Sequence, residues 1–152
     1  MLYRILFSVS LVMLLGSIAH GQIQRRMTPF LGTWDYENIK GFEVWKMNGK
    51  ELSGQAFRIK ENRDTLLIET MRLAYEDKKL VMYVRVENQN GGKEIRFEES
   101  SKLRNKFVNE SHDFPKSIYY QFKRFNRKKV QVLLNHPHKD THTKPITLVR
   151  RR

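Results

Sequence analysis

The chain has 152 residues, no cysteine, and 29 Lys and Arg against 16 Asp and Glu, a formal charge of +13. The length fits one domain. Hydrophobic residues make up 39% of the chain and charged residues 30%, a composition that excludes both a disordered basic tail and a membrane protein of several spans. The lack of cysteine excludes disulfides, thiol catalysis, cysteine-ligated zinc and a lipid anchor on cysteine.

The N-terminal segment has the pattern of a secretory signal peptide. Arg4 provides a positive start, the eleven residues 5–15 are apolar apart from two serines, and small residues follow up to Gly21. The run is shorter than the roughly 20 apolar residues of a spanning helix. We expect residues 1–21 to be the signal peptide, residues 22–29 a lead-in and residues 30–152 one exported domain, periplasmic or extracellular. An uncleaved N-terminal anchor is the alternative.

Beyond residue 29 the apolar residues alternate as in half-buried β-strands. In residues 79–88, for example, Leu80, Met82 and Val84 share one face. Short turn-forming segments separate such runs, among them Asn48-Gly49, which suits a type I′ hairpin turn, and the segments 61–64, 76–79, 88–92 and 126–129. At most one helical turn is expected, around residues 27–30. The ten predicted strands lie near residues 31–37, 42–48, 51–60, 64–75, 79–88, 93–100, 102–109, 116–125, 128–135 and 145–151.

Many antiparallel strands with no helix to cover a sheet edge favour closure. We therefore predict an all-β, up-and-down antiparallel barrel of 8–10 strands, since a closed barrel leaves no edge exposed. A flat β-sandwich is the structural alternative.

The segment FLGTWDYE, residues 30–37, resembles the Gly-x-Trp start of the lipocalin and calycin barrels. The resemblance implies that Gly32 and Trp34 are structural signature residues. It also implies that a basic residue near the chain end, Arg150 or one of the two arginines after it, packs over the tryptophan ring as a cation–π contact.

A longer pattern adds to this likeness. It comprises FLGTW, FEVWK (42–46), LSGQAFRIK (52–60), VENQNGGKEIRF (86–97) and FVNESHDFPKSIYY (107–120). It resembles an uncharacterised bacterial secreted family, domain of unknown function 6265, with a lipocalin-like barrel. The resemblance implies a fold and export but no activity. The basic, histidine-bearing stretch from Asn126 onward departs from the family pattern.

Two segments carry candidate ligand-binding residues. Glu43 and Trp45 share one face of their strand; if they point inward, the buried carboxylate needs a partner, for which Arg58, Arg72 and His112 are candidates. Such a pair beside aromatic rings suits a ligand with a polar head and an apolar body. If they point outward, Glu43 faces water.

The second segment is NESHDFPK, with His112, Asp113 and Phe114. Its residue types indicate a turn leading into a strand, and the alternative is a ligand contact at the barrel mouth, where His112 would join Glu43.

Metal and cofactor chemistry have little support in the sequence. His136, His138 and His142 lie in one loop, but their spacing matches no structural metal site, and nothing requires His112 to bind haem. The motifs of nucleophilic hydrolysis and phosphate binding are missing. We therefore assign no metal, no cofactor and no catalytic residue.

The positive charge is concentrated in the C-terminal third. Residues 22–101 carry 14 basic and 13 acidic side chains, whereas residues 102–152 carry 14 and 3. In a barrel these last strands are neighbours, so one flank should be strongly basic. Because we expect export, an anionic lipid or polysaccharide surface is a better partner for this flank than nucleic acid, which we exclude.

Three functions follow. The first is an exported monomer that binds a small apolar or amphipathic ligand through Glu43, Trp45, Arg58 and the 112–114 segment. The second is a surface-interaction protein using the basic flank. The third is a small isomerase or cyclase with Glu43 and His112 as its acid–base pair.

Overall fold

The computed structural model describes residues 24–152 except 88, 124–125 and 136–142. The predicted signal peptide and the three histidines of the 136–142 loop lie outside the described residues. Two units are distinguished, with the boundary between Phe30 and Leu31. In the first, α-helical residues 24–27 run directly into the 3₁₀ helix η1 (Thr28–Phe30), so the helical segment is longer than the single turn expected around residues 27–30. Within the described part of the chain, no helix has both the length and the apolar character to cross a membrane.

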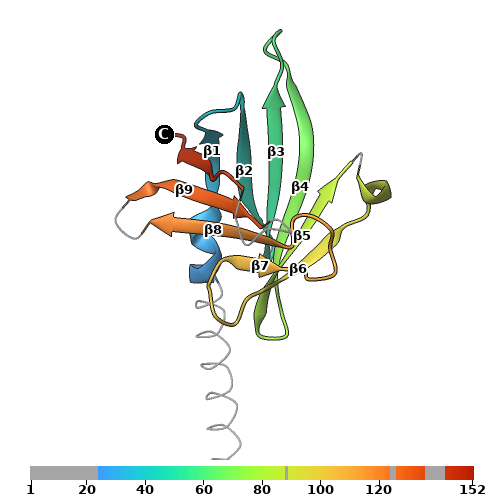
Figure 1. Ribbon diagram of the computed structural model, residues 1–152. Coiled ribbons are helices and arrows are strands. Elements are labelled where there is room, and N and C mark those ends of the chain that lie inside the picture. The colour runs from blue at the N-terminus through green and yellow to red at the C-terminus, as the bar shows by residue number, and fades with distance from the viewer. Residues whose placement is uncertain (1–23, 88, 124–125, 136–142) are drawn as a thin grey trace, which may run out of the picture. The chain divides into compact units, whose positions relative to one another are not determined.

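The second unit is a closed barrel of ten antiparallel strands in up-and-down order (Figure 1). Closure comes from β1 and β10, where Trp34 lies opposite Arg150. This confirms the all-β barrel and contradicts the sandwich alternative. The strands are β1 (Gly32–Tyr36), β2 (Gly41–Asn48), β3 (Glu51–Ile59), β4 (Thr65–Glu76), β5 (Lys79–Val86), β6 (Ile95–Glu99), β7 (Lys106–Val108), β8 (Ser117–Lys123), β9 (Asn126–Leu134) and β10 (Ile146–Arg150), with a 3₁₀ turn η2 (Asn90–Gly92) between β5 and β6.

Three details of the strand prediction are wrong. The strand predicted at 102–109 shrinks to β7, because a turn precedes it in which the Glu99 carboxylate accepts the Asn105 backbone N–H at 3.0 Å. The turn predicted at 126–129 is instead the start of β9, which is irregular where it faces the end of β8. The hairpin turn after β2 is shifted by one residue, to Gly49 and Lys50, with only Gly49 at positive φ.

Strand alternation fixes which connections share an end of the barrel. The connections after β1, β3, β5, β7 and β9 lie at one end, here called the loop end, and the remaining connections lie at the other, the hairpin end. Inside, alternate residues of all strands bury large apolar side chains as the period-two pattern requires. They include Trp34, Trp45, Leu52, Leu73, Met82, Phe97, Phe107 and Leu148.

Candidate functional site

The signature residues of the first and last strands meet in the structure. The Arg150 guanidinium lies 4.1 Å from the centre of the Trp34 ring, and it also donates a hydrogen bond to the Leu31 carbonyl. Gly32 has a φ of +110°, and a Cβ there would lie 2.9 Å from Arg150 Nη1. Glycine is therefore needed both for the backbone conformation and for the passage of the arginine. The contact joins the two ends of the barrel sequence.

Glu43 and Trp45 point into the barrel and are buried, with 6% and 1% of their surface exposed. The Trp45 indole N–H donates to Glu43 Oε2 at 3.1 Å. The ring lies against Gly54 of the neighbouring strand, where a Cβ would come within 2.8 Å of it. The absence of a side chain at Gly54 thus allows the tryptophan to face the carboxylate.

Two tyrosines complete the environment of Glu43. Tyr36 Oη donates to Oε1 at 3.1 Å, and Tyr120 Oη, on β8, donates to Oε2 at 3.3 Å. Burial raises the pKa of Glu43, and the three hydrogen bonds from Trp45, Tyr36 and Tyr120 partly oppose this. Burial, together with the charge of Glu43, raises the pKa of both phenols, which therefore stay protonated. Three neutral donors thus satisfy the carboxylate.

A second carboxyl group, Glu69, shares the interior with Glu43. The strand register places Glu43, Ala56 and Glu69 in one row across β2, β3 and β4, so the small Ala56 separates the two acids. Burial, and secondly the charge of Glu43, raises the pKa of Glu69 to about 7. The interior therefore holds one fully buried acid and one that is half-ionised near neutral pH.

Glu69 borders a cleft of about 210 Å³ at the loop end. β5 ends at Val86, opposite Glu69, whereas β4 begins four residues before that pair, so residues 65–68 have no partner strand on the β5 side. The overhang leaves an opening with apolar and charged walls. Its lining residues are Leu67, Ile68, Glu69, Thr70, Arg85 and Glu87.

The cationic partners expected for Glu43 do not bind it. Arg58 is exposed at the end of β3, level with Gly41 and Leu66. Arg72 lies on the outer face of β4, because it alternates with the inward-facing Met71 and Leu73. Three neutral donors bind Glu43 instead: Trp45 on the same strand, Tyr36 on the neighbouring strand β1, and Tyr120 on β8, which only closure of the barrel brings near.

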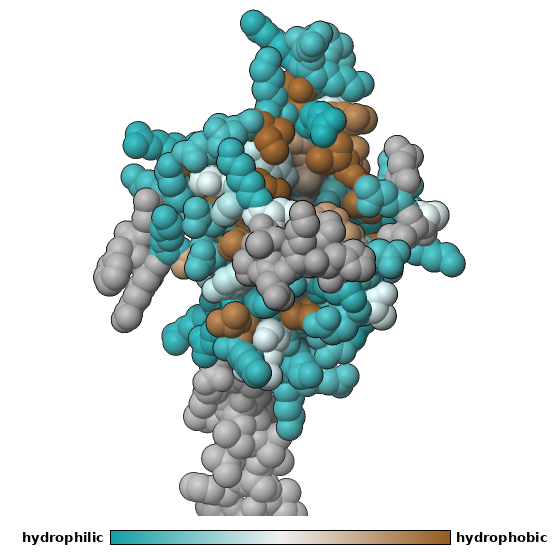
Figure 2. All heavy atoms as spheres, in the orientation of Figure 1, coloured by the Kyte–Doolittle hydropathy of each residue, from teal (hydrophilic) through white to brown (hydrophobic). Residues whose placement is uncertain are grey.

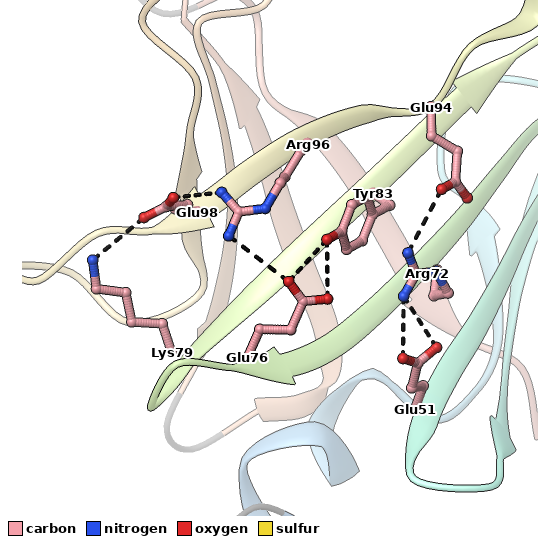
Figure 3. A network of polar contacts seen from close by, with 8 residues as sticks. All are labelled: Glu51, Arg72, Glu76, Lys79, Tyr83, Glu94, Arg96 and Glu98. Carbon is pink, nitrogen blue, oxygen red and sulfur yellow. Dashed lines mark hydrogen bonds and ion pairs between the residues drawn. The ribbon is translucent and has the colours of Figure 1, made fainter.

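Arg72 belongs to a polar network on the outer face of β3–β6 (Figure 3). It contacts Glu51 at 3.1 Å and Glu94 at 3.6 Å, and its guanidinium lies 3.9 Å from the centre of the Tyr83 ring. Tyr83 in turn donates to Glu76 at 2.9 Å. The network continues through Arg96, Glu98 and Lys79. These groups are substantially exposed, so each pair contributes little to stability.

The segment 109–116 between β7 and β8 is built as a turn. The Asn109 side chain accepts the backbone N–H groups of Ser111 and His112 at 3.0 and 3.1 Å. His112 is half-buried, with Nδ1 3.1 Å from the Pro115 carbonyl oxygen and its ring 5.7 Å from that of Phe97. This arrangement agrees with the turn interpretation.

Neither Asp113 nor Phe114 is drawn into the barrel: both are exposed, Phe114 by 41%. Glu43 and His112 each have other hydrogen-bond partners, so the structure supplies no contact for the suggested acid–base pair.

The basic C-terminal strands β7–β10 are neighbours in the barrel. Part of their charge is neutralised, because Lys129 pairs with Glu37 at 2.6 Å and Arg151 pairs with Asp35. The side chains of Lys102, Arg104, Lys106 and Lys123 add positive charge to this flank, and three of the four are exposed.

Among the residues that the structure describes, no group of three or more His, Asp or Glu side chains is arranged to hold a metal ion. Comparison with known proteins adds no relative: no family model, no curated protein and no solved structure matches this chain.

Glu69 was missed by the sequence analysis. Its signal was present, because it stands two and four residues before Met71 and Leu73 and so shares their inward face.

Proposed function

We propose that the protein is exported and binds a small amphipathic ligand with a basic head group at the loop end of the barrel. The observation that carries the proposal is the cleft at the loop end, whose lining combines the half-buried Glu69 with the apolar residues Leu67 and Ile68. Export is supported by the pattern of residues 1–21. Membership of domain of unknown function 6265 remains a proposal based on the segments quoted above.

The charge around Glu69 favours a cationic head group. Burial and the nearby charge of Glu43 make the ionised form of Glu69 unfavourable, and a ligand ammonium group would relieve both effects. Arg85, which lies opposite Thr70 on β5, borders the same cleft. Because the cleft is smaller than drug-sized pockets of about 300–1,000 Å³, it suits a compact head group with a short apolar chain.

Titration with octylamine, and with octanol as the uncharged match, tests this proposal. We expect octylamine to bind more tightly than octanol, and its affinity to rise as the pH passes about 7 and Glu69 ionises. A hydrogen bond to a charged group contributes roughly 1.5–3 kcal/mol, so Glu69→Gln should weaken octylamine binding by about 10- to 100-fold.

The control for that titration is Glu98→Gln, which removes a carboxylate from the outer face and should leave binding unchanged. Equal affinities for the amine and the alcohol, or an unaffected Glu69→Gln variant, would contradict the proposed function.

A second candidate is contact with an anionic surface through the basic flank. It is favoured by the adjacency of β7–β10 and by the exposed Lys102, Arg104 and Lys123. Binding to heparin should then fall steeply with salt and weaken in the Lys102→Gln/Arg104→Gln variant. Heparin binding that does not change with salt concentration would contradict this second candidate function.

A further inference from the structure

The loop end carries an exposed apolar patch at the projecting β3–β4 hairpin. Ile39 and Leu66 are 52% and 45% exposed, and Leu66 lies on the same face as Arg58, its partner on β3. The Ile59 backbone N–H donates to the Lys40 carbonyl at 2.8 Å and so holds the β1–β2 loop against β3. Figure 2 shows apolar residues gathered over the upper part of β3 and β4, below a hydrophilic hairpin tip.

Basic side chains surround these apolar residues. Lys40, Arg58, Lys60 and Arg63 are all exposed, against three acidic neighbours, Glu37, Glu61 and Asp64, of which Glu37 is paired with Lys129. We call the two apolar residues, Ile39 and Leu66, and these four basic residues together the tip patch.

We propose that the tip patch docks the barrel on an anionic lipid bilayer, with the β3–β4 hairpin lying along the interface. In this orientation Ile39 and Leu66 reach below the head groups, while the long basic side chains stay at the level of the lipid phosphates. The net charge of +13 attracts the protein to such a surface over a longer range. The proposal does not depend on ligand binding in the cleft.

The mixture of residue types favours lipid over a protein partner. A stable protein interface needs about 800 Å² on each side with a largely uncharged core, whereas here the few exposed apolar residues lie beside four exposed basic ones. Apolar residues within a cationic surface match the chemistry of an anionic bilayer. The apolar side chains enter its hydrocarbon interior, and the basic side chains bind its anionic head groups.

The absence of native cysteine allows a direct test with two matched positions. Leu66→Cys and Leu103→Cys of the full chain are each labelled with an environment-sensitive fluorophore. Both leucines are 45% exposed, but Leu103 lies between β6 and β7 at the hairpin end, within the basic flank. Vesicles of phosphatidylglycerol and phosphatidylcholine are compared with vesicles of phosphatidylcholine alone.

We expect the label at position 66 to shift to the blue on the anionic vesicles only, and the label at position 103 to stay unchanged. A shift at position 103, with or without one at 66, overturns the proposal and favours the basic flank. The absence of a fluorescence shift at both positions also overturns the proposal, even if the N-terminal segment binds the protein to the vesicles. A shift at position 66 that needs no vesicles and grows with protein concentration identifies a second copy as the occupant, which also overturns it.

Charge variants give an independent measure of the same surface. Each basic residue near an anionic membrane contributes about fivefold in partitioning, so Arg58→Gln/Lys60→Gln should weaken vesicle binding by about 30-fold. Lys102→Gln/Arg104→Gln removes the same charge at the hairpin end and should change it much less. Equal losses in the two variants contradict a specific tip patch. None of the four residues borders the ligand cleft, so octylamine binding should persist in both variants.

Discussion

Replacement of Glu69 by glutamine should stabilise the protein at alkaline pH and leave it unchanged at acidic pH. In the folded protein the pKa of this carboxyl group is raised from the ordinary 4.5 to about 7. The folded state therefore binds this proton more tightly than the unfolded chain does. Stability due to this group is present in full below pH 4.5 and is lost as the pH rises through about 7.

The size of the stabilisation expected for Glu69→Gln follows from this difference in pKa between the folded and the unfolded protein. The difference between pKa values of 4.5 and about 7 corresponds to at most about 3 kcal/mol once the group is ionised. Glu69 is only half-buried and borders an open cleft, so solvent screens part of the effect. We expect Glu69→Gln to exceed the wild type in unfolding free energy by about 1–2 kcal/mol at pH 8.5.

Urea unfolding of both proteins between pH 4 and 8.5 measures this difference, because the titrations of groups that do not interact with Glu69 cancel in the comparison. Glu61→Gln, which removes an exposed carboxylate from the β3–β4 turn, controls for the change in net charge. If the difference in unfolding free energy between the two proteins stays constant with pH, or is largest at pH 4, the environment of Glu69 does not disfavour its ionised form.

Three further outcomes follow from the geometry. Arg150→Met removes the cation–π contact with Trp34 and a backbone hydrogen bond, so it should lower the unfolding free energy by about 1–3 kcal/mol in a urea titration. Gly54→Ala places a methyl group against the Trp45 ring and should cost about 1–3 kcal/mol, with an altered near-ultraviolet circular dichroism spectrum; an unchanged spectrum would contradict the contact. Glu98→Gln breaks only exposed ion pairs on the outer face, so its urea midpoint should equal that of the wild type.

The alternation of apolar residues was enough to predict the ten strands and the barrel. Period-two patterning depends only on neighbouring residues, so local sequence contains it. The starts of β7 and β9 were predicted wrongly because contacts between segments decide them. The Glu99 carboxylate accepts a hydrogen bond from the turn before β7, and residues 126–129 belong to β9 through an irregular pairing with β8. The turn at 109–112 was predictable, since asparagine side chains bind the backbone two or three residues on.

The sequence by itself determined that Glu43 and Trp45 share one face, that turn formers precede β8, and that the charge lies in the last third of the chain. It did not determine which face is the inside, nor what satisfies the buried carboxylate. Pairing of β1 with β2 brought Tyr36 to Glu43, whereas only closure of the barrel brought Tyr120 to Glu43 and the last-strand arginine to the first-strand tryptophan. These pairs are 7, 77 and 116 residues apart in sequence. Likewise, Glu69 is set beside Glu43 by the register of three strands across a small alanine, a relation between strands that no local pattern contains.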